Sequence, residues 1–87
     1  MTTVIAVHDV DDVAHWLSSS KRAEFFGAHG MTVRTFVSPG GGQRVGLIIE
    51  NVPSLEALTE ALQGDDAAEA MKHDRVIPDT VELFVAS

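Results

Sequence analysis

The sequence contains no cysteine and no tyrosine, and aromatic residues make up only 6% of its 87 residues. Without cysteine the chain cannot form a disulfide, a thiolate-bound zinc site or an iron–sulfur cluster, and this composition fits a reducing cytoplasm. Basic residues are also scarce, since 6 Lys and Arg stand against 13 Asp and Glu for a formal net charge of −7. This sign argues against nucleic acid or an anionic membrane as the main partner.

Long hydrophobic runs are missing as well. No apolar stretch approaches the ~20 residues that a membrane-spanning helix needs. Residues 1–8 lack the basic leader and the apolar run of a signal peptide, so we expect a cytoplasmic protein. Hydrophobic residues nevertheless amount to 45%, which is typical of a folded globule. The length predicts a single domain that covers residues 1–87.

Patterns of apolar, β-branched and turn-forming residues predict four strands and three helical segments. The expected strands are Thr2–His8, Met31–Ser38, Arg44–Asn51 and Thr80–Ala86, and the expected helices run from Asp9–Asp12 to about Gly27 or Ala28, from Pro53 to Gly64, and from Asp66 to about Lys72. The Ser18–Ser20 run is a weak point, because serine hydroxyls compete for backbone hydrogen bonds. A turn at Pro39–Gly42 predicts an antiparallel hairpin.

The resulting order is βαββαβ, which predicts a ferredoxin-like α+β domain with a four-stranded antiparallel sheet and helices on one face. Right-handed crossovers are expected to place the first and third strands side by side and parallel in the centre. The second and fourth strands are then expected antiparallel at the edges.

Side chains alternate along a strand, so each expected strand divides into two sets. One set is wholly aliphatic and is assigned to the helices: Ile5, Val7, Val33, Val37, Val45, Leu47, Ile49, Val81, Leu83 and Val85. The other set mixes apolar bulk with ionisable groups: Val4, Ala6, His8, Thr32, Arg34, Phe36, Gly46, Ile48, Glu50, Glu82 and Phe84.

The second face carries an apolar patch of Val4, Phe36, Ile48 and Phe84 that needs a cover. Burying these side chains would stabilise the fold by roughly 1.5–3 kcal/mol each. The simplest cover is a second copy, sheet facing sheet, related by two-fold symmetry. We therefore expect a homodimer whose two sheets enclose a cavity.

The whole chain resembles the dimeric α+β barrel superfamily in its βαββαβ order and helix-free sheet face. The segments Val7–Asp9, Trp16–Leu17, Arg22–Gly30 and Met71–Pro78 are similar to a small bacterial subfamily of it. That superfamily includes cofactor-free monooxygenases, isomerase-like enzymes and haem-degrading members. The resemblance implies a small enzyme of this type, although a mechanism that needs a tyrosine is absent here.

Four ionisable side chains are expected to converge at one end of the second face. If Ser38 faces Arg44 across the hairpin, Arg34 faces Ile48 and Thr32 faces Glu50. His8 then lies near both Glu50 and Glu82, with Arg34 diagonal to Glu50. The expected wall consists of Phe36, Ile48 and Phe84, with Thr32 beside it and Trp16 either in the core or interface or at the cavity mouth.

The sequence thus predicts a cofactor-free enzyme that isomerises, cyclises or oxygenates a small aromatic, polyketide-like or lactone-like molecule. His8 would be the acid–base group, Glu50 or Glu82 its orienting carboxylate, and Arg34 the residue that holds an anion. The same residues would equally suit a structural network that ties two sheets together. In that case the chain is a non-catalytic ligand-binding or oligomerisation module.

Three further interpretations concern ligands and helix faces. Neither metal nor cofactor is expected, because His8, Asp9, Glu50 and Glu82 show no recognisable ligand spacing. Haem, with His8 as the obvious internal ligand, is an alternative. Lys21, Arg22 and Glu24 are interpreted as a solvated helix face.

Overall fold

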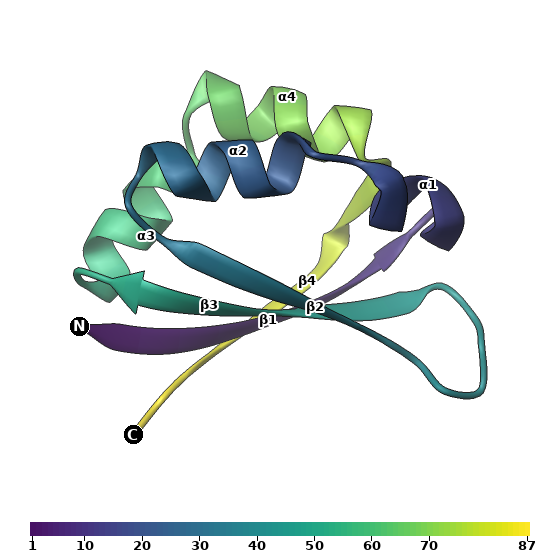
Figure 1. Ribbon diagram of the computed structural model, residues 1–87, viewed down its shortest axis with the longest axis horizontal. Coiled ribbons are helices and arrows are strands. Elements are labelled where there is room, and N and C mark those ends of the chain that lie inside the picture. The colour runs from purple at the N-terminus through teal and green to yellow at the C-terminus, as the bar shows by residue number, and fades with distance from the viewer.

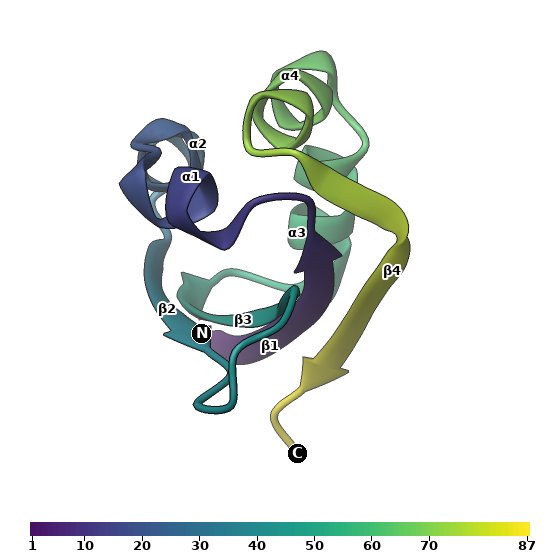
Figure 2. The same cartoon turned by 90° about the vertical axis from the view of Figure 1, so that its right-hand side faces the viewer.

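The structure, a computed structural model, describes all 87 residues as a four-stranded sheet beneath a layer of helices (Figure 1). The strands are β1 (Thr2–Val10), β2 (Thr32–Val37), β3 (Arg44–Val52) and β4 (Val76–Val85). The helices are α1 (Val13–Ser18), α2 (Lys21–Ala28), α3 (Leu55–Leu62) and α4 (Asp65–His73). The strand order is β2-β3-β1-β4, and Figure 2 shows every helix on the same side of the sheet. The ferredoxin-like α+β plan is therefore confirmed.

The direction of the two central strands differs from the prediction. β1 and β3 are antiparallel neighbours, with His8 paired to Val45, whereas parallel strands were expected. The helical crossover returns the chain so that β2 runs in the direction of β1, and the hairpin then reverses β3. β3 must therefore run against β1. The predicted pairing within the hairpin is confirmed, because Arg34 faces Ile48 and Thr32 faces Glu50.

The helical segment between β1 and β2 is broken where the serine run predicted a weak point. α1 ends at Ser18 and α2 begins at Lys21, so two short helices replace the single expected one. Asp12 begins α1 by accepting a hydrogen bond from the backbone N–H of His15 at 3.1 Å. The break lets α2 change direction and lie over the sheet beside α4 (Figure 1).

The two faces of β1 are exchanged relative to the prediction. The residues that lie under the helices are Val4, Ala6, His8 and Val10, all of them buried. Ile5 pairs with Ile48 and, like Val7, lies on the open side of the sheet. In β3 the predicted assignment is correct, because Val45, Leu47 and Ile49 are buried beneath the helices. One strand was therefore assigned to the wrong face while its neighbour was assigned correctly.

β4 begins at Val76 rather than at Thr80 and includes Pro78. Proline is accommodated because β4 is an edge strand, where a missing N–H donor is tolerated. The pairing with β1 shifts between Glu82 and Ile77, so β4 carries extra residues at this point. The backbone N–H of Asp9 donates instead to the Thr80 hydroxyl at 2.8 Å. This irregularity bends β4 upward to meet the end of α4 (Figure 2).

The hydrophobic core lies between the sheet and the helices. Its largest fully buried side chains include Trp16 of α1, Ile49 of β3 and Leu58 of α3. Phe26 of α2 belongs to the same cluster. None of the helices has the length and apolar character needed to cross a lipid bilayer.

Candidate functional site

An apolar cavity of about 80 Å³, partly open to the surface, lies between the sheet and the helices. Residues of β1, β3 and β4 line it from below, and residues of all the helices line it from above. The lining is hydrophobic except for three side chains, which are His8, Arg22 and Asp74. A mostly apolar hollow with a few polar groups is the usual form of a small-ligand site.

His8 extends from β1 into this cavity and is only 5% exposed. Its Nδ1 donates a hydrogen bond to the backbone carbonyl of Asp9 at 3.3 Å, which assigns the proton to Nδ1 and a free lone pair to Nε2. Nε2 has no protein partner, yet no fully buried side-chain polar atom is left unpaired. Nε2 therefore meets the open volume. The ring lies edge-on to Trp16, with the ring centroids 5.8 Å apart.

The surroundings hold His8 in its neutral form. Burial lowers the pKa of His8, and the positive charges of Arg22 and Arg44 lower it further. The hydrogen bond to the Asp9 carbonyl and the Asp9 carboxylate act in the opposite direction without reversing the shift. A neutral imidazole with a free lone pair is able to accept a proton from a bound molecule.

Arg22 places a positive charge beside the same cavity. Its Nη1 lies 3.4 Å from Asp74 Oδ2, and both Nη atoms donate to the Trp16 carbonyl at 3.2 Å. Its Cζ lies 4.1 Å from the centre of the Trp16 ring, a cation–π distance. Burial lowers the pKa of the Arg22 guanidinium, and the Asp74 carboxylate partly offsets this. These contacts fix the cation at the polar end of the cavity.

Arg22 and Asp74 correct the interpretation of the sequence, which placed Arg22 on a solvated face and gave Asp74 no role. Arg22 is 9% exposed and Asp74 is 3% exposed. The burial of Arg22 could have been predicted from its spacing to Phe26. The two residues are four positions apart on α2 and therefore share one helix face. Asp74 follows the last residue of α4, where no periodicity remains to indicate its direction.

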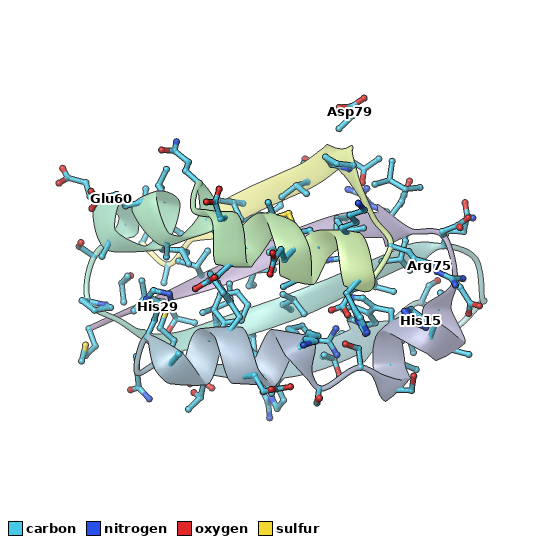
Figure 3. All side chains as sticks on the ribbon, turned by 90° about the horizontal axis from the view of Figure 1, so that it is seen from above. His15, His29, Glu60, Arg75 and Asp79 are labelled. Atoms are coloured by element: carbon cyan, nitrogen blue, oxygen red, sulfur yellow. The ribbon has the colours of Figure 1, made fainter.

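Asp74 also connects the cavity to the outer surface of the helical layer. Its Oδ1 accepts a hydrogen bond from His73 Nδ1 at 3.1 Å, and His15 Nε2 donates to the His73 carbonyl at 2.6 Å. Figure 3 shows His15 beside the C-terminal end of α4, with α2 and α4 lying side by side above the sheet. The two histidines thus join α1 to α4 at the end of the layer that holds Arg22.

The structure does not bring His8 together with Arg34, Glu50 and Glu82. His8 lies under the helices, whereas these three exposed side chains belong to the opposite, open face. Glu50 is also at the far end of the sheet, because β1 and β3 are antiparallel and His8 pairs with Val45. The expected His8–Glu50 and His8–Glu82 pairs are therefore not formed. A backbone carbonyl, not a carboxylate, orients the His8 ring.

The residues expected to line the site divide in the same way. Thr32, Phe36, Ile48 and Phe84 lie on the open face, where the single chain encloses nothing over them. Trp16 is the one expected lining residue that borders the cavity, and it is also part of the core.

Glu82 has a different partner from the one predicted. Arg44 Nη2 donates to Glu82 Oε1 at 2.7 Å, and Arg44 Nη1 donates to Asp9 Oδ1 at 3.3 Å. The three side chains form an exposed ionic cluster, called here the Arg44 cluster, on the open face. No group of three or more His, Asp or Glu side chains in this structure is arranged so as to hold a metal ion.

No family model matches this sequence, and no curated protein matches it. Solved structures do match. An antibiotic biosynthesis monooxygenase superposes with a TM-score of 0.63 at 14% identity, covering 100% of this chain and 97% of the other. A conserved Bacteroides thetaiotaomicron protein of unknown function, described as a possible oxidoreductase, has a TM-score of 0.53 at 14% identity, covering 98% of this chain and 92% of the other. An EthD family protein from Bacillus halodurans has a TM-score of 0.50 at 13% identity, covering 100% of this chain and 98% of the other.

These matches define the class of the fold. They cover nearly the full length of both chains in each case, so the likeness extends over the whole domain. At such low identity the shared property is the fold alone. The ferredoxin-like α+β fold predicted from the sequence is therefore confirmed, and membership of the dimeric α+β barrel superfamily stays a prediction.

Proposed function

We propose that this chain is a small cofactor-free enzyme that removes a proton from a small, mostly apolar molecule, with His8 as the base. The observation that carries the proposal is the free Nε2 of a neutral, nearly buried histidine inside an apolar cavity. The similar structures described as a monooxygenase and as a possible oxidoreductase support an enzyme of this fold.

In this proposal His8 Nε2 takes a proton either from a carbon next to a carbonyl group or from a phenolic hydroxyl. The bonding electrons stay on the substrate as an enolate or phenolate. Arg22 lies at the same end of the cavity, and its charge lowers the free energy of that anion. Return of the proton to another carbon gives isomerisation, internal attack gives cyclisation, and reaction of the anion with molecular oxygen gives oxygenation. Asp74 acts as a positioning residue, because it holds the Arg22 guanidinium.

The volume of the cavity restricts what it holds at rest. About 80 Å³ is less than the ~150 Å³ of an apolar cavity that binds benzene. A haem or a flavin is far larger than this volume. An aromatic or lactone-like substrate therefore requires the lining side chains to move apart as it enters.

Carbon–hydrogen exchange tests the proposal with model compounds in place of the natural substrate. A panel of small lactones, hydroxylated aromatics and 1,3-dicarbonyl compounds is incubated in D₂O, and loss of carbon-bound protons is followed by NMR. We expect His8→Asn to slow the accelerated exchange by about 10²–10⁴-fold. His15→Asn, a change of a histidine that does not line the cavity, should leave the rate unchanged. A folded His8→Asn protein that exchanges as fast as the wild type would remove the proposal.

We also propose that a second copy covers the open face of the sheet. Phe84 is 55% exposed there, and its partner Ile5 on β1 and Phe36 on β2 are exposed too, which is unusual for a monomer. The Arg44 cluster lies on the same face and carries both signs of charge, which is compatible with a self-complementary two-fold interface. Native mass spectrometry should show a dimer that Phe84→Asp converts into monomers. A monomeric wild-type protein would contradict this part.

A non-catalytic ligand-binding module is the second candidate. Its support is that Arg22 is already engaged by Asp74 and by the Trp16 carbonyl, as in a purely structural network. Such a module would be stabilised thermally by members of the panel without accelerating their exchange. In that case His8→Asn would bind the same compounds and show the same thermal shifts.

A further inference from the structure

A groove of about 430 Å³ runs between α2 and α4 on the outer surface of the helical layer. Phe25 of α2 and Ala70 of α4 line this groove and also line the inner cavity. They are the residues that the two hollows share. Where the groove and the cavity meet, the Phe25 ring and the Ala70 methyl group therefore stand between them.

Phe25 has the properties of a movable partition. Its ring is half-buried and rests edge-on against Phe26, with centroids 5.0 Å apart. Its other neighbour is the exposed ring of His29, also with centroids 5.0 Å apart. Ala70 opposite contributes only a methyl group, which cannot close the opening if the Phe25 ring rotates. Rotation of such a partly exposed side chain occurs within picoseconds to nanoseconds.

The groove outside the partition is predominantly acidic. Glu24, Asp66 and Glu69 contribute three carboxylates, against one ammonium group from Lys21. His29 and His73 complete its polar lining. At neutral pH this charge distribution disfavours an anion on its way inward, whereas the cavity beyond is apolar.

We propose that Phe25 is the gate between the α2–α4 groove and the cavity, and that the acidic groove admits uncharged molecules in preference to anions. This inference rests on the proposed function, because it assumes that the cavity receives a ligand. It defines the substrate class further. The molecule enters uncharged and becomes an anion only beside Arg22, after His8 has taken its proton.

Fluorescence quenching of Trp16 measures access to the cavity directly. Trp16 is the only tryptophan, the chain has no tyrosine, and Trp16 lines the cavity while being 1% exposed. Acrylamide serves as the uncharged probe. We expect Phe25→Ala to raise the acrylamide quenching constant severalfold and Ala70→Phe to lower it. If Phe25→Ala does not fold, Phe25→Leu provides the same test with a smaller change.

The competing entrance is tested with Leu83→Ala, which shortens a partly exposed side chain of β4 that also lines the cavity. We expect its quenching constant to rise less than that of Phe25→Ala. A larger increase in Leu83→Ala than in Phe25→Ala would place the entrance at β4 and overturn the proposal. Unchanged quenching in Ala70→Phe would also overturn it.

Iodide tests the charge preference in the Phe25→Ala background. We expect weak iodide quenching that rises severalfold when Asp66→Asn and Glu69→Gln are added. The matched control neutralises two exposed carboxylates on α3, with Glu56→Gln and Glu60→Gln, and should give no such rise. Equal rises in both pairs would show an effect of net charge alone and would overturn the preference. Because quenching needs no turnover, failure of the gate and failure of His8 catalysis are distinguishable.

Discussion

Similar ionic groups lie on the two sides of the sheet in opposite environments. Beneath the helices, Arg22 pairs with Asp74 in a nearly dry setting, next to the uncharged ring of His8. On the open face, Arg44 binds two carboxylates at the surface. The open face has more ion pairs and the shorter contact, 2.7 Å to Glu82 against 3.4 Å to Asp74.

Burial, rather than the number or length of the ion pairs, determines what these charged groups contribute to stability. Water screens the Arg44 cluster, so its contribution to stability is small. Burial of Arg22 and Asp74 makes each depend on the other, because neither charge has water to replace its partner. The same burial lowers the pKa of His8 and creates a base.

The largest loss of stability is expected when a core aromatic side chain is removed. Phe26→Ala, in the core beneath the helices, should lower the free energy of unfolding by about 3–5 kcal/mol, because it leaves a cavity. Phe84→Ala, on the open face, should lower it by less than about 1 kcal/mol for a single subunit. Urea unfolding of dissociated protein measures both. Similar losses in the two variants would show that the two faces are equally important to the folded subunit.

Breaking the buried ion pair should have the next largest effect. Asp74→Asn leaves the Arg22 charge without its carboxylate and should cost about 3 kcal/mol. Combining Arg22→Met with Asp74→Leu should recover much of this, because no buried charge remains. Urea unfolding of Arg22→Met, of Asp74→Leu and of the combined variant gives the coupling energy. A combined loss equal to the sum of the single losses would contradict the coupling.

The lowered pKa of His8 predicts a dependence of stability on pH. As pH falls below about 6.5, the unfolded chain takes up a proton at His8 while the folded chain resists it. Wild-type protein should therefore lose stability relative to His8→Asn, by up to about 1.4 kcal/mol per pH unit. Above that pH both states are neutral at this site and the difference should be constant. Urea unfolding at about pH 5 and about pH 8 tests this, and a constant difference would be the contrary result.

The smallest effect is expected at the Arg44 cluster. Arg44→Met should change the free energy of unfolding by less than about 1 kcal/mol, and added salt should shrink the change further. Unfolding in low and high salt, beside the same measurements on Asp74→Asn, completes the comparison. A loss at Arg44 as large as that at Asp74 would mean that exposure does not separate the two ion pairs.

The order of the elements could be predicted from the sequence, but the faces of β1 could not. Both alternating sets of β1 are largely apolar, so hydrophobicity does not distinguish them. The expected strand ended at His8, which left out two informative residues. Val10 continues the set of His8 and is fully buried, while Asp9 continues the set of Ile5 and is charged. A strand extended by these two residues favours the observed orientation.

The candidate site could not be predicted in full from the sequence, because it is built from contacts between residues that are far apart in the chain. Arg22 interacts with the backbone carbonyl of Trp16 and with Asp74, which lies 52 residues further along the chain. The sequence shows that Arg22 shares a helix face with Phe26. It does not show that the Asp74 carboxylate, at the end of α4, lies beside Arg22. His8 was proposed from its type and its position, and its predicted neighbours lie elsewhere because the two faces of β1 were exchanged. Tertiary packing supplied what local patterns lacked.

The irregular pairing of β4 also limits how chains can aggregate. An edge strand with a continuous row of free backbone groups would template endless strand addition, as in a fibril. Pro78 removes one donor from this edge, and the extra residues beside Thr80 interrupt the spacing of the others. The opposite edge, β2, is only 6 residues long. Growth of the sheet by addition of further strands at its edges is therefore discouraged, even though its open face remains apolar.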